Sequence, residues 1–80
     1  MDYLVVVVRF IVHCWNKDSY NKLVELLQTK GASLGIRLLS KLPQLNTVVV
    51  EMDPDKVGKL YSTGLVRLIE ASYPFGLESV

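Results

Sequence analysis

The 80-residue chain has few of the residues that catalysis, metal binding or cross-linking requires. It contains one cysteine, Cys14, and one histidine, His13, so it can form no internal disulfide and has too few soft ligands for a structural zinc site. Neighbouring strand residues point to opposite faces, so these two are not expected to pair as base and nucleophile. No glycine loop has phosphate-binding spacing. We therefore expect no enzyme activity, no metal and no cofactor.

An excess of one charge is also lacking. The chain has nine basic residues and eight acidic residues, which gives a formal net charge of +1. Proteins that bind nucleic acids usually carry a strong basic surface that neutralises phosphates. The two acidic residues Asp53 and Asp55 stand at a predicted helix start, where the helix dipole favours negative charge, and this explains them better than metal binding does. The composition thus predicts no nucleic-acid partner.

The longest apolar run, "LVVVVRFIV", begins at Leu4 and is too short to cross a bilayer. Arg9 interrupts it, and Asp2 stands where a secretory signal would carry positive charge. We predict a buried strand and no membrane partner. The compartment stays open: cytoplasmic for a free-standing protein, and extracellular for a domain excised from a secreted precursor.

Segments typical of strands and helices alternate along the chain. Residues 3–14 are rich in β-branched side chains and predict the first strand. A helix follows, with possible caps at residues 16–19, and we expect Lys30 and Gly31 to close it. Alternating apolar residues predict strands at 35–42 and 46–52, joined near Pro43. Asp53 and Pro54 are typical of a helix start.

The second helix should end at Gly64, and residues 65–72 predict the last strand. The order β-α-β-β-α-β is that of an α+β ferredoxin-like domain. Right-handed crossovers place both helices on one face of a four-stranded antiparallel sheet with strand order 4-1-3-2. We therefore expect one domain over residues 1–72, an extended tail over residues 73–80, and one sheet face without helices.

Both sides of the first strand are largely apolar, although only one side can lie under the helices. We assign the side with Arg9 and His13 to the open face, because burying these groups without partners would cost several kcal/mol. Alternation adds residues from all four strands to this face. They are Tyr3, Val5, Val7, Ile11, Arg37, Leu39, Lys41, Thr47, Val49, Glu51, Arg67 and Ile69. An apolar centre with a polar rim is typical of a protein-binding surface.

Other interpretations of this face stay open. The charges at Arg37, Lys41 and Arg67 also suit edge strands that avoid sheet-to-sheet aggregation. The same face could pair two copies of the chain in a homodimer, as in an oligomeric ligand-binding or regulatory module. An RNA-recognition module shares the topology, but the third strand "NTVVVEM" is aliphatic and acidic where that module carries aromatic residues.

The stretch from Leu34 to Glu70 resembles the second half of the propeptide inhibitor domain of subtilisin-like serine proteases. In that family a glycine precedes the second strand, a proline marks the turn, the third strand is aliphatic, and a glutamate follows an aliphatic residue in the last strand. The matching positions here are Gly35, Pro43, Val48, Val49, Val50, Val57, Leu60, Val66, Ile69 and Glu70.

The resemblance implies a protease inhibitor, with a chaperone role also compatible. In this family the open sheet face packs on two protease helices, and carboxylates meet the helix amino-termini. The docking residues implied here are Val5, Val7, Leu39, Val49, Glu51, Ile69 and Glu70. The carboxy-terminal tail then occupies the substrate cleft, with Tyr73, Phe75, Leu77 and Val80 as its anchors.

Overall fold

The computed structural model describes residues 7–72, which form a four-stranded antiparallel sheet and two α-helices. The elements, including the two short 3-10 helices η1 and η2, are β1 (Val8–Cys14), α1 (Lys17–Leu34), β2 (Ile36–Leu42), η1 (Pro43–Leu45), β3 (Thr47–Met52), η2 (Pro54–Lys56), α2 (Val57–Ser62) and β4 (Val66–Ala71). The strand order β2-β3-β1-β4 confirms the predicted order, read from the opposite edge. The expected strand residues 3–6 and the tail 73–80 lie outside the described residues.

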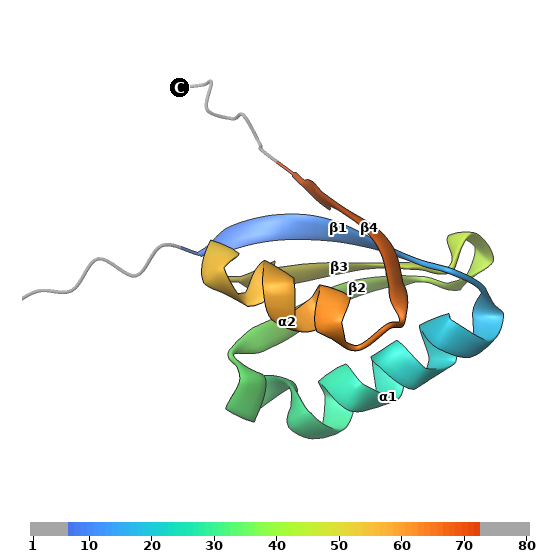
Figure 1. The fold of residues 1–80 in the computed structure, drawn as a ribbon, viewed down its shortest axis with the longest axis horizontal. Helices are drawn as coiled ribbons and strands as arrows, with labels where there is room; N and C mark the ends of the chain where they lie inside the picture. Colours follow the sequence, from blue (N-terminus) through green and yellow to red (C-terminus); the bar gives the residue numbers. More distant parts are fainter. Residues whose placement is uncertain (1–6, 73–80) are drawn as a thin grey trace, which may run out of the picture.

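Both helices lie on the same side of the sheet, below it in Figure 1, and no described element covers the other side. The central strands β1 and β3 supply half of the buried apolar side chains, from every second residue of each strand. The buried apolar residues are Phe10, Val12, Cys14, Tyr20, Leu23, Leu27, Ile36, Val48, Val50, Met52, Leu60 and Val66. The core therefore sits between the helices and one face of the sheet.

Helix α1 begins where the sequence predicts and ends later. The Asn16 side chain accepts a hydrogen bond of 2.8 Å from the Ser19 amide, which confirms an amino-terminal cap here. The predicted end at Gly31 is wrong, because α1 continues to Leu34 and is closed by Gly35 in the left-handed region at φ 75°. Gly31 serves packing instead, since a Cβ there would lie 2.7 Å from the Ile36 carbonyl oxygen.

The start of the second helical segment confirms the sequence interpretation. The Asp53 carboxylate accepts a hydrogen bond of 2.9 Å from the Asp55 amide, and Pro54 occupies the first position of η2. η2 runs directly into the short α2, and Gly64 follows at φ 77°. A compact connection thus joins β3 to the edge strand β4.

Two irregularities interrupt the strand pairing. The pairing of β2 with β3 shifts between Leu38 and Ser40, and the pairing of β1 with β4 shifts between His13 and Cys14. A bulge adds one residue to one strand, and the alternation of faces changes beyond it. Both shifts therefore decide which side chains reach the open face.

Candidate docking face of the sheet

The helix-free side of the sheet carries three rows of side chains that run across the strands. One row holds charges, one has two aliphatic residues between two polar ones, and one is mixed. In the order of the strands, they are Arg37, Glu51 and Arg9; Ser40, Val49, Ile11 and Glu70; and Leu42, Thr47, His13 and Leu68. We call these residues the open face.

The charged row places an acidic side chain between two basic ones. Glu51 on β3 lies opposite both Arg37 on β2 and Arg9 on β1. A guanidinium nitrogen of Arg37, Nη1, lies 3.7 Å from Oε1 of Glu51. Because the Glu51 side chain is 28% exposed, it remains accessible from the open side while its charge is balanced by neighbours.

The aliphatic row forms the centre of the open face. Val49 and Ile11 lie opposite each other on β3 and β1, and both are only partly buried. Val7, just before β1, is 47% exposed. Both helices lie on the other side of the sheet, and no element among residues 7–72 covers the aliphatic side chains on this side. Such surface gains free energy when a partner removes it from water.

A hydrogen-bonded network ties Glu70 to the middle of the sheet. The Thr47 hydroxyl donates to the Leu45 carbonyl at 2.7 Å and lies 3.3 Å from Nδ1 of His13. On the other side of the ring, Nε2 of His13 lies 2.9 Å from Oε1 of Glu70. The two nitrogens of the His13 ring therefore face the Thr47 hydroxyl and the Glu70 carboxylate at the same time. The Glu70 carboxylate is thereby oriented although its side chain is 55% exposed.

The expected position of Ile69 on the open face is wrong. Ile69 lies opposite Val12 and packs against the core, whereas Leu68 lies opposite His13 and is 38% exposed. The reason is the bulge in this pairing, which makes Arg67 an extra residue between the partners of His13 and Cys14. The alternation of apolar and polar residues could not locate this bulge, because both sides of β4 contain apolar residues.

The bulge in β2 exchanges the sheet faces that we expected for Lys41 and Leu42. Leu39 and Ser40 together oppose Val49, so Leu39, which is 36% exposed, stays at the border of the open face. Beyond the bulge, Lys41 lies opposite the buried Val48 and belongs to the helix side, contrary to expectation. Leu42 takes the place on the open face that the sequence alternation gave to Lys41.

Sequence reasoning missed a group of exposed apolar side chains at one end of the sheet. These are Trp15, Leu42, Leu45 and Leu68. The Cys14 amide donates to the Asn46 carbonyl at 2.9 Å, which brings the end of β1 beside η1, where Leu45 is 69% exposed. The proline turn and the end of the first strand were visible in the sequence, but their contact was not. These exposed apolar groups lie at the end of the sheet beside η1.

The single cysteine of the chain, Cys14, is buried. Burial raises the pKa of the Cys14 thiol, so the reactive thiolate is disfavoured near neutral pH. Within residues 7–72, no group of three His, Cys, Asp or Glu side chains is placed to hold a metal ion. No helix in this range is long and apolar enough to cross a membrane.

The structure brings together some of the predicted docking residues. Val49, Glu51 and Glu70 share the open face, Val7 lies next to β1, Leu39 borders the face, and Ile69 belongs to the core. Val5 and the expected tail anchors Tyr73, Phe75, Leu77 and Val80 lie outside the described residues. Searches of protein-family models, curated proteins and solved structures gave no match to the chain.

Proposed function

We propose that the chain is a propeptide-like inhibitor of a subtilisin-like serine protease and docks through the open face. The observation that carries this proposal is the uncovered sheet face itself. Its centre is aliphatic at Val49 and Ile11, and carboxylates stand at Glu51 and Glu70 on either side. This combination suits a partner that presents apolar surface together with groups that attract anions.

Protein helices meet both requirements when they pack across a sheet with their amino-termini near these carboxylates. A helix amino-terminus has free amides and a partial positive charge, and a carboxylate there contributes about 0.3–1 kcal/mol. Glu70 is suited to this role because the His13 ring already orients it, at 2.9 Å. Pre-orientation reduces the entropy that binding would otherwise cost.

The tail supplies the inhibitory contact in this proposal. Residues 73–80 follow edge strand β4 in the sequence, and they include the apolar side chains of Tyr73, Phe75, Leu77 and Val80. In the proposed complex these residues bind the protease cleft as an added strand, with alternate side chains in pockets. A protease that binds only the folded chain also stabilises it by mass action, which is compatible with a chaperone role.

Deletion of the tail tests this mechanism. We expect a chain that lacks residues 76–80 to keep its circular dichroism spectrum and lose inhibition of a subtilisin-like protease that the full chain inhibits. Peptide hydrolysis at increasing inhibitor concentration measures the effect. Equal inhibition by the shortened and full chains would refute the role of the tail.

A further inference from the structure

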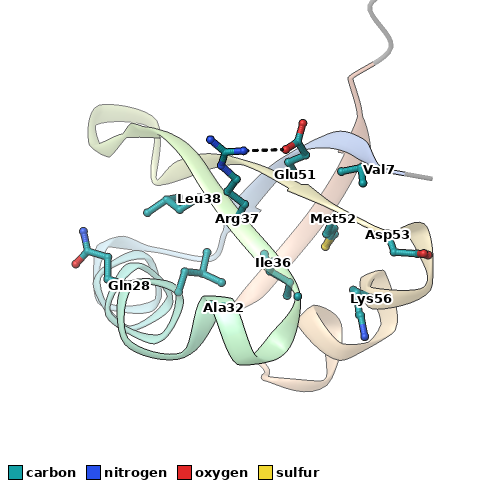
Figure 2. A pocket seen from close by; sticks show the side chains of 13 residues that line it. Val7, Gln28, Ala32, Ile36, Arg37, Leu38, Glu51, Met52, Asp53 and Lys56 are labelled. Carbon is teal, nitrogen blue, oxygen red and sulfur yellow. Dashed lines mark ion pairs between the residues drawn. The ribbon is translucent and has the colours of Figure 1, made fainter. Parts of the chain in front are cut away.

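A recess lies along the β2 edge, mainly on the helix side of the sheet. It has a volume of about 840 Å³ and lies against the second half of α1, β2 and the end of β3 (Figure 2). Its apolar lining includes Leu27, Ala32, Ile36 and Leu38. The recess reaches around the beginning of β2 to Val7, Arg37 and Glu51. Its volume falls in the usual range of about 300–1,000 Å³ for ligand sites.

The recess lies beside an unpaired strand edge. Within residues 7–72, β2 has a neighbouring strand on one side only, namely β3. The outer backbone groups of such a strand can pair with an extended peptide, while pockets beside the strand select its side chains. Figure 2 shows Arg37 directed toward Glu51, away from Gln28 and Ala32 on α1. The wall beside α1 is formed by Leu27, Gln28 and Ala32 instead.

The bulge gives this edge a defined pattern of side chains. Ile36, Leu38 and Lys41 lie opposite Met52, Val50 and Val48, which are alternate residues of β3. All three β3 partners are buried on the helix side, so the three β2 residues share that side. A strand added at this edge would therefore lie beside Ile36, then Leu38 and then Lys41. Every second residue of the added strand would meet one of these side chains.

We propose that the β2 edge binds an extended peptide as a fifth, antiparallel strand, with the pattern acidic-x-apolar-x-apolar. The acidic side chain pairs with Lys41, and the two apolar side chains lie over Leu38 and Ile36 in the recess. Lys41 is exposed and has no ion pair within the described part of the chain. The recess borders the open face at Arg37 and Glu51, but the proposed peptide contacts lie on the helix side of β2, and the proposal does not depend on the proposed inhibitor function.

Charge favours such a peptide over a second copy of β2. The strand contains Arg37 and Lys41 and no acidic residue. Two β2 edges side by side would bring two Lys41 side chains to one seam without a carboxylate from either strand, while each Arg37 stays paired with Glu51. An acidic partner instead gains from the same field.

Titration by NMR tests the proposal with the isotope-labelled 80-residue chain and the peptide Ser-Glu-Thr-Leu-Thr-Val-Ser. We expect chemical-shift changes in residues 36–42 of β2 and 27–32 of α1. A control peptide with lysine in place of glutamate should bind about fivefold more weakly, as an exposed charge pair allows. The variant Lys41→Glu should reverse this preference, and Lys59→Glu on α2 should leave it unchanged.

Several results would overturn the proposal. These are no shift changes at millimolar peptide, changes confined to β4 or the open face, or equal binding of the two peptides. Shifts in β2 that depend on chain concentration without peptide would identify a second copy as the occupant. Because no protease is present, each result is independent of the inhibitor proposal.

Discussion

At the scale of single residues, Glu70 links the fold to the proposed docking. Its carboxylate lies 2.9 Å from the His13 ring, which contacts Thr47 in turn. An exposed carboxylate would normally lose side-chain entropy on meeting a partner. Here the network already restricts it, so we infer that Glu70 contributes more to docking than its exposure alone suggests.

Replacement of Glu70 should weaken inhibition measurably. We expect Glu70→Gln to raise the inhibition constant against a subtilisin-like protease about fivefold, since it removes about 1 kcal/mol of attraction to a helix amino-terminus. The matched control Glu25→Gln makes the same chemical change on exposed α1 and should have no effect. Equal inhibition by both variants and the wild type would exclude Glu70 from the interface.

Cys14 makes stability depend on pH in the alkaline range. Burial raises its pKa in the folded state, so the unfolded chain releases the thiol proton at lower pH. The stability that the neutral Cys14 thiol contributes is fully present below the pKa of the unfolded chain. It is lost as the pH rises through the higher pKa of the folded chain. We expect the free energy of unfolding to fall above about pH 8.5, and to fall less in Cys14→Ala. Urea unfolding of both chains at pH 7 and pH 10 measures this, and parallel losses would contradict it.

At the scale of elements, local signals predicted the order and nearly all boundaries. Asn16, Asp53 and Gly64 act where capping chemistry places them, and the strand order follows from crossover handedness. The end of α1 was misplaced because Gly31 and Gly35 are both plausible stops. The choice depends on how closely the helix approaches β2, which is a tertiary contact and not a local preference.

The faces of the edge strands were harder to predict than the strands themselves. One bulge moves Lys41 to the helix side and another moves Ile69 into the core. A bulge requires no special residue in either strand, so the alternation beyond it cannot be read from the sequence. The His13–Glu70 contact joins residues 57 positions apart and depends on the pairing register.

Two glycines that lie in helices should respond oppositely to substitution. Gly31→Ala places a Cβ 2.7 Å from the Ile36 carbonyl oxygen, and we expect a net loss of about 1–2 kcal/mol of unfolding free energy. Gly58→Ala in α2 meets no atom within 4 Å and should gain about 0.5–1 kcal/mol from reduced backbone entropy. Chemical denaturation measures both changes, and a stabilised Gly31→Ala would contradict the close approach of α1 to β2.

At the scale of the whole molecule, residues 7–72 place a core on only one side of the sheet. A small domain of this kind buries a limited share of its surface and has a small stability margin. The exposed apolar groups of the open face then favour a partner, either a protease or a second copy. These two alternatives predict different behaviour of the free chain.

Solution mass separates the two alternatives. We expect the chain to be monomeric at micromolar concentration in sedimentation, and we expect Val49→Asp to stay folded while it loses inhibition, because it places a charge at the centre of the interface. Arg67→Asp, at the exposed bulge of β4, is the control and should keep inhibition. A wild-type dimer that Val49→Asp converts to monomer would instead support the homo-oligomeric module.

The most direct test is a titration of subtilisin-like proteases with the purified 80-residue chain, followed by the rate of peptide hydrolysis. We expect inhibition that saturates when the chain and the protease are about equimolar, and that declines slowly as the protease cleaves the chain. Full protease activity at excess chain, with the chain folded by circular dichroism and several such proteases tested, would contradict it.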